Sequence, residues 1–70
     1  MLKVEELKVS QKYTDKIIGQ VKVLEVNVEK DEIRLEILDK EMADRFVESK
    51  DGGFKFSLKE TIEDFTLCTE

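Results

Sequence analysis

The sequence predicts a small α+β domain: a strongly curved antiparallel β-sheet or partial barrel of about five strands, with one amphipathic helix. Two observations predict it. Apolar and polar residues alternate through residues 17–38, with a reversal of phase near Val23 and Leu24, and residues 39–50 change to helical spacing. Side chains on a strand alternate between the two faces of a sheet, so the reversal indicates a β-bulge or sharp bend. Such bends allow a small sheet to curl.

A β-hairpin is predicted around the bend. Residues 17–28 form its first strand, and the polar residues 29–32 form its turn. Alternating apolar residues over 33–37, separated by Arg34 and Glu36, form the second strand. Two alternating segments joined by a short polar turn are typical of an antiparallel hairpin.

The amphipathic helix is predicted over residues 39–50. Apolar residues at 42, 43, 46 and 47 lie on one helical face, and Asp39 is a favourable N-cap. An alternative is open, because Asp51-Gly52 is also a strong hairpin turn. It would pair residues 46–50, as a strand, with residues 54–58.

Shorter elements are predicted on either side of these two. Residues 54–58 alternate as a strand, and Ser57 begins a capping-box pattern that predicts a helical turn to about Ile62. Residues 65–67, with Cys68 as a candidate extension, would form the last strand, and residues 2–9 the first. Residues 10–16 are predicted to be an exposed connection. Strands and helices in this order fit either an OB-like or an SH3-like barrel, in one domain that spans residues 1–70.

Apolar residues at the inward-facing positions of these elements form the predicted core, because burial of apolar surface is the main favourable term in folding. They are Ile17, Val21, Val23, Val26, Ile33, Leu35, Ile37, Met42, Phe46, Phe54, Phe56, Leu58, Ile62, Phe65 and Leu67.

Composition indicates a folded protein with a highly charged surface. Hydrophobic residues make up 40% and charged residues 41% of the chain, with a net charge of −5. No segment approaches the roughly 18–20 apolar residues that span a bilayer, and the first residues lack the apolar core of a secretion signal. Together with the single cysteine, these features predict a cytoplasmic protein with no membrane contact. Its small size and Lys/Glu-rich composition also favour a phage or mobile element as its source.

The sequence lacks the residue patterns that catalysis and cofactor binding most often use. It has no histidine, and Cys68 is the only cysteine. Neither a Cys–His pair nor a histidine-based zinc site can therefore form. There is no EF-hand loop and no Gly-rich phosphate loop. We expect a protein that is not an enzyme and that binds no metal or cofactor.

Another protein is the expected partner, and the expected role is that of an interaction or regulatory module. An exposed sheet edge would accept a strand from a partner or from a second copy of the chain, which would give a homodimer. An alternative is an inhibitor that imitates nucleic acid with an acidic face. That face would comprise Glu29, Asp31, Glu32, Glu36, Asp39, Glu41, Asp44 and Glu48.

Nucleic acid is a further alternative partner. Residues 1–22 carry five basic and three acidic side chains, a net charge of +2, although the chain as a whole is acidic. Lysines would contact phosphates and a tyrosine ring would stack on a base. The candidate contacts are Lys8, Lys12, Tyr13, Lys16 and Lys22. The overall acidic charge disfavours this alternative relative to a protein partner.

Overall fold

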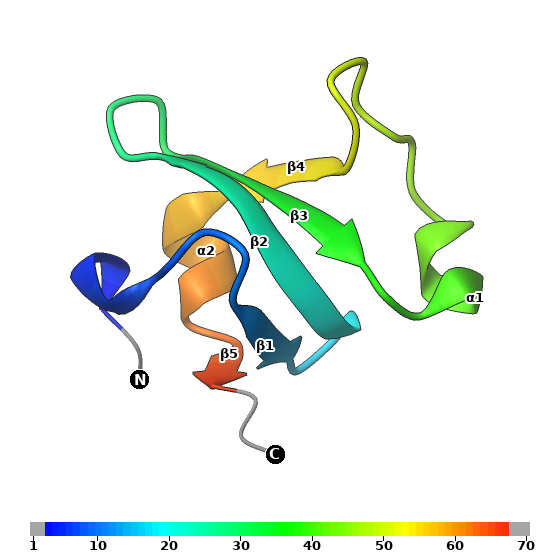
Figure 1. The fold of residues 1–70 in the computed structure, drawn as a ribbon, viewed down its shortest axis with the longest axis horizontal. Coiled ribbons are helices and arrows are strands. Elements are labelled where there is room, and N and C mark those ends of the chain that lie inside the picture. The colour runs from blue at the N-terminus through cyan, green and yellow to red at the C-terminus, as the bar shows by residue number, and fades with distance from the viewer. Residues whose placement is uncertain (1–2, 68–70) are drawn as a thin grey trace.

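Five short strands form one antiparallel sheet in the computed structural model, which describes residues 3–67 (Figure 1). The strands are β1 (Lys12–Asp15), β2 (Gly19–Asn27), β3 (Glu32–Ile37), β4 (Phe54–Ser57) and β5 (Phe65–Leu67). Their order in the sheet is β4-β3-β2-β1-β5, so β5 returns beside the first strand. The five-stranded antiparallel sheet of an α+β domain is confirmed. The sheet is not closed, because β4 and β5 are its two edges and do not pair with each other.

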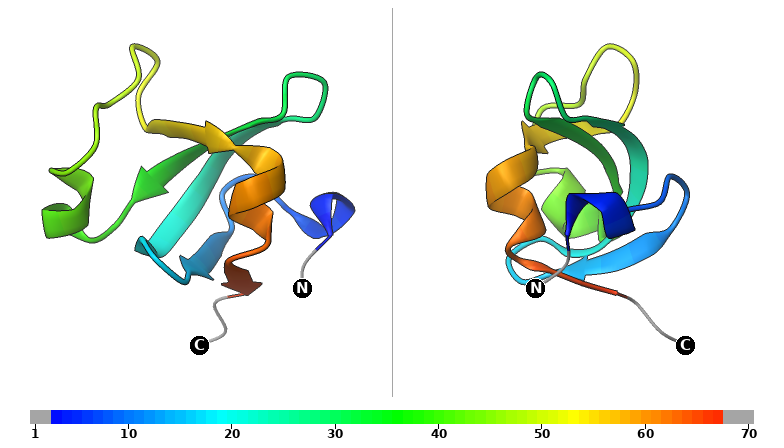
Figure 2. Two further views of the ribbon diagram at one scale, coloured as in Figure 1. Left: turned by 180° about the vertical axis from the view of Figure 1, so that it is seen from behind. Right: turned by 90° about the vertical axis from the view of Figure 1, so that its left-hand side faces the viewer.

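Three short helical segments accompany the sheet. They are the 3-10 helix η1 (Val4–Glu6) and the α-helices α1 (Lys40–Ala43) and α2 (Leu58–Ile62). Figure 2 shows the sheet curving, with α2 joining its two edge strands on the inner side of the curve. Leu58 and Ile62 of α2 are buried, so this helix contributes to the core.

The predicted bulge lies in β2 and is confirmed. Val23 pairs with Leu35 and Glu25 pairs with Arg34, so Leu24 is one extra residue on the β2 side of the ladder. Val21 and Val23 face the core before the bulge, and Val26 is the half-buried residue paired with Ile33 after it. The inward-facing positions of β2 therefore change from odd to even residue numbers, as the sequence pattern predicted.

Most of the predicted core residues are buried, and Val26, Met42 and Phe56 are half-buried and pack against the core. Two of the predicted residues are exposed. Ile17 is 71% exposed and Phe46 is 39% exposed, so their assignment to the core is wrong. Tyr13 and Ile18, which were not predicted, are buried instead. The side chain of Leu67 lies outside the described part of the structure. The buried apolar residues are Tyr13, Ile18, Val21, Val23, Ile33, Leu35, Ile37, Phe54, Leu58, Ile62 and Phe65.

The first strand does not lie at residues 2–9 as predicted. Leu2 is outside the described residues, Val4–Glu6 is a 3-10 turn, and β1 occupies the segment predicted to be an exposed connection. The hydroxyl of Tyr13 explains the N-terminal arrangement: it accepts a hydrogen bond from the Lys8 amide (3.1 Å) and donates one to the Glu6 carbonyl (3.4 Å). The Tyr13 ring also stacks on Phe65, with centroids 5.4 Å apart. These contacts bury β1 and hold the N-terminal segment beside it.

The predicted helix over residues 39–50 is much shorter than expected. The Asp39 cap is confirmed, since its Oδ1 accepts from the amides of Glu41 (3.0 Å) and Met42 (3.3 Å). However, α1 ends at Ala43. The ring of Phe46 packs edge-on against two rings of β4, 6.3 Å from Phe54 and 5.4 Å from Phe56, and this packing draws the chain away from the helix axis. The hairpin alternative is also wrong, because residues 46–50 form no strand and β4 is an edge of the sheet that pairs with β3 alone.

Asp31, in the β2–β3 turn, caps α2 although the two are far apart in the sequence. Its Oδ1 accepts from the Lys59 amide and its Oδ2 accepts from the Ser57 hydroxyl, both at 2.8 Å. The Asp31 carbonyl accepts from the amide of Leu58 (3.0 Å). Ser57 makes no side-chain cap of its own, so the capping box predicted there is wrong. The helix begins where the neighbouring hairpin supplies an acceptor for its unpaired amides.

We predict that Asp31→Ala lowers the free energy of unfolding by about 1–2 kcal/mol in a urea titration. The variant loses both side-chain acceptors. It also places alanine at a φ of +54°, a left-handed conformation that alanine tolerates less well than aspartate or asparagine. Asp31→Asn keeps one carbonyl acceptor and is expected to lose less. Glu29→Ala, in the same exposed turn, is the matched control and should change stability by less than about 0.5 kcal/mol. Equal stability of Asp31→Ala and Glu29→Ala would contradict this account of α2.

Candidate interaction groove

Two of the exposed large apolar side chains, Ile17 and Phe46, line one open groove of about 210 Å³. We call it the apolar groove. It is bounded by the β1–β2 turn, the segment after α1, β4 and α2. Its lining residues are Asp15, Ile17, Ile18, Phe46, Phe56, Glu60, Thr61 and Asp64.

One wall of the groove is the β1–β2 turn, whose shape depends on Asp15. Asp15 is buried, and its Oδ1 accepts from the amides of Ile17 (2.8 Å) and Ile18 (2.9 Å). Gly19 closes the turn at a φ of +94°, in the left-handed region that favours glycine. The amide of Lys16 donates to the Asp64 carbonyl (3.0 Å), which ties the turn to the end of α2. The turn is therefore fixed at both ends, with Ile18 buried and Ile17 exposed to solvent.

Phe46 also lines the groove, and it contacts the sheet but does not enter the core. Its edge-on packing against Phe54 and Phe56 leaves part of the ring accessible. The chain next turns back into β4, where the amide of Ser49 donates to the Gly53 carbonyl (2.7 Å). The segment that follows Phe46 is therefore closed into a turn immediately before β4.

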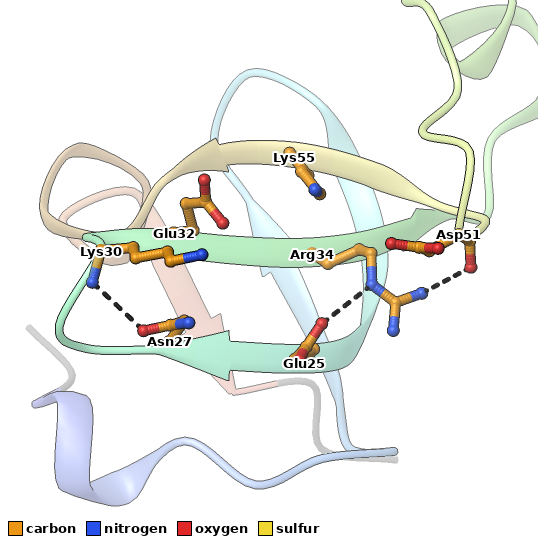
Figure 3. Close-up of a pocket in the computed structure, with 7 residues that line it drawn as sticks. All are labelled: Glu25, Asn27, Lys30, Glu32, Arg34, Asp51 and Lys55. Carbon is orange, nitrogen blue, oxygen red and sulfur yellow. Dashed lines mark hydrogen bonds and ion pairs between the residues drawn. The ribbon is translucent and has the colours of Figure 1, made fainter.

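Arg34 and the bulge hold that turn on the outer face of the sheet (Figure 3). Arg34 Nη1 donates to the carbonyls of Asp51 (3.0 Å) and Gly52 (3.1 Å). Gly53 lies so close to the sheet that an added Cβ would lie 2.6 Å from Leu24 Cδ1. The extra residue of the bulge therefore contacts the turn directly, and Gly53 has a φ of +71° that favours glycine.

A polar depression of about 190 Å³ surrounds Arg34 on this outer face. It is lined by Glu25, Asn27, Lys30, Glu32, Arg34, Asp51 and Lys55 (Figure 3). Three of these residues are acidic and three are basic, and Arg34 Nε already contacts Glu25 Oε1 at 3.3 Å. The positive and negative side chains of the depression are therefore equal in number.

The rim of the apolar groove, in contrast, has one sign of charge. Asp15, Glu60 and Asp64 are acidic, and none of the eight lining residues is basic. Glu60 is exposed on α2, and Asp64 follows the end of that helix. Among residues 3–67, neither of these two carboxylates forms an ion pair. The groove therefore combines an apolar wall with carboxylates that have no cationic partner in the described part of the chain.

The predicted nucleic-acid contacts are only partly brought together. Lys12 and Lys22 face each other across β1 and β2, whereas Lys8 and Lys16 lie in loops. Tyr13 is 1% exposed and its ring stacks on Phe65, so it presents no face to a base. The stacking role predicted for Tyr13 does not fit this structure.

The predicted acidic face is divided between two ends of the domain. Glu29 and Asp31 lie at the β2–β3 turn, at the start of β3. Asp39, Glu41 and Asp44 lie at α1, beyond the opposite end of that strand (Figure 1). The remaining members are Glu32 and Glu36 of β3, and Glu48 in the segment after α1. Asp31 and Asp39 already accept hydrogen bonds from helix amides. Two of the eight carboxylates are therefore engaged in helix capping, and the other six stay candidates for this face.

Residues 3–67 contain no group of three side chains suited to hold a metal ion, and no helix of sufficient length and apolar character to cross a bilayer. Cys68 lies outside the described residues. Comparisons with protein families, curated proteins and solved structures found no match to this chain.

Sequence reasoning missed the apolar groove because it placed Ile17 and Phe46 in the core. The missed signal is the segment from Asp15 to Gly19, in which two adjacent isoleucines stand between a turn-forming acid and a glycine. An acid followed closely by a glycine is typical of a turn, and in a turn the alternation of a strand does not decide which isoleucine faces the core. Here Ile18 is buried and Ile17 is exposed.

We predict that Asp15→Ala costs about 1–3 kcal/mol of stability, because it leaves the amides of Ile17 and Ile18 without their acceptor. Hydrogen exchange of these two amides should accelerate more than the loss of global stability explains. Asp15→Asn, which keeps the amide oxygen as an acceptor, is the matched control and should retain most of the protection. Unchanged exchange of both amides in Asp15→Ala would show that Asp15 does not shape the turn.

Proposed function

We propose that this domain is a non-enzymatic protein-interaction module and that the apolar groove binds a segment of another protein. The observation that carries the proposal is the exposure of Ile17 on a turn that Asp15 and Asp64 fix in place. A fixed apolar side chain beside an exposed ring loses little conformational entropy when a partner covers it. Exposed apolar surface of this kind is typical of interaction sites.

The size of the groove favours a side chain of a protein over a small-molecule ligand. Its volume of about 210 Å³ is below the roughly 300–1,000 Å³ of pockets that enclose small molecules. The groove is also open to solvent, so a peptide backbone can continue past a side chain that occupies it.

We further propose that the sheet is an SH3-like partial barrel. The features that favour it are the bent β2–β3 hairpin and the helical turn α2 immediately before β5. An OB-like barrel would place a substantial helix between the third and fourth strands, whereas α1 comprises only Lys40–Ala43.

Selection from a displayed random-peptide library tests the proposed function. We expect the wild-type domain to enrich peptides whose affinity falls roughly 10-fold for Ile17→Ser, since a buried isoleucine contributes on the order of 1.5 kcal/mol. Val28→Ser is the matched control, because Val28 is 66% exposed in the β2–β3 turn and lies outside the apolar groove. Both variants should keep the stability of the wild type within about 0.5 kcal/mol.

Two results would contradict the proposal. Peptides that bind Ile17→Ser as well as the wild type would place the interaction elsewhere. Binding of single-stranded oligonucleotide at low salt, with loss on Lys12→Gln or Lys22→Gln, would favour a nucleic-acid-binding domain instead.

A further inference from the structure

We propose that the partner segment carries a bulky apolar side chain flanked by lysine or arginine. This inference rests on the proposed function, since it concerns the occupant of the same groove. It depends on the arrangement of the lining residues, in which an apolar wall of Ile17 and Phe46 accompanies carboxylates from α2 and the residues that follow it.

The apolar wall selects the central side chain of the segment. Ile17, Ile18, Phe46 and Phe56 provide aliphatic and aromatic surface, and a leucine or phenylalanine would cover it. Burial of this surface supplies affinity without regard to the charge of the neighbouring residues.

The rim selects the flanking residues. Glu60 is exposed and Asp64 is half-buried, and both carboxylates border the groove. A lysine or arginine next to the central side chain would lie beside them, whereas a glutamate would be repelled. Two exposed ion pairs of this kind change an affinity by roughly 3- to 10-fold in total.

Basic residues of the domain do not cancel this preference. Four basic residues adjoin lining residues in the sequence, namely Lys16, Arg45, Lys55 and Lys59. All four are exposed, and none of them lines the groove. Asp15 adds a third negative charge, although its Oδ1 is occupied by the turn amides. The side chains that border the groove therefore favour a cationic segment.

Synthetic peptides of equal length test the inference by NMR titration of the labelled domain. Three of them carry a central leucine flanked by lysines, by serines or by glutamates. A fourth keeps the lysines and replaces the leucine with serine. We expect the amides of Ile17, Ile18 and Thr61 to shift most, and the Lys-flanked leucine peptide to bind roughly 3- to 10-fold more tightly than the Ser-flanked one.

Variants of the rim identify the carboxylates responsible. Glu60→Gln combined with Asp64→Asn should remove the preference for lysine and leave binding of the Ser-flanked peptide unchanged. Glu63→Gln is the matched control, because Glu63 lies between these two residues in the sequence, is exposed, and does not line the groove. Raised salt should weaken the Lys-flanked peptide more than the Ser-flanked one.

The possible outcomes separate the two proposals. Equal binding of all three leucine peptides would overturn the charge preference and leave the interaction groove intact. Binding of the lysine peptides irrespective of the leucine, or no shift of the groove amides with any peptide, would overturn both. A concentration-dependent mass of the free domain, abolished by Ile17→Ser, would show that a second copy of the chain occupies the groove, which would overturn the assignment to a separate partner.

Discussion

Between Val23 and Glu25, β2 carries one residue more than the strand with which it pairs. Because of this extra residue, both halves of β2 direct apolar side chains to the core. The first half of β2 places Val21 and Val23 in the core beside β1, and the second half places Val26 opposite Ile33. Without the change of register, the residues beyond Leu24 would present their polar side chains to the core. The curvature that encloses a core in so short a chain depends on this bulge.

The same bulge influences the groove on the other side of the sheet. Because the register changes, Glu25 and Arg34 come opposite each other on the outer face, where Arg34 holds the carbonyls of Asp51 and Gly52. Leu24 lies against Gly53 in the same turn. The returning turn leads directly into β4, and two rings of that strand, Phe54 and Phe56, contact Phe46. A local irregularity in the ladder is thus connected, through two contacts, to the surface that we propose as the interaction site.

The sequence predicted the parts of the fold in which apolar residues carry the pattern. The bulge and the β2–β3 hairpin could be predicted because valine, isoleucine and leucine occupy their inward-facing positions. β1 could not be predicted, since its two inward positions are occupied by Tyr13 and Asp15, which are buried through hydrogen bonds. The length of α1 was overestimated because helical spacing does not reveal that Phe46 packs against β4. The same placement of Phe46 in a helix and in the core concealed the groove.

Cross-strand nuclear Overhauser effects in the β2–β3 hairpin test the central claim most directly, since they report the pairing of each residue along the ladder. The account predicts contacts between Val23 and Leu35 and between Glu25 and Arg34, with Leu24 opposite no residue of β3. A regular ladder, in which Leu24 lies opposite Arg34 and Glu25 opposite Ile33, would contradict it.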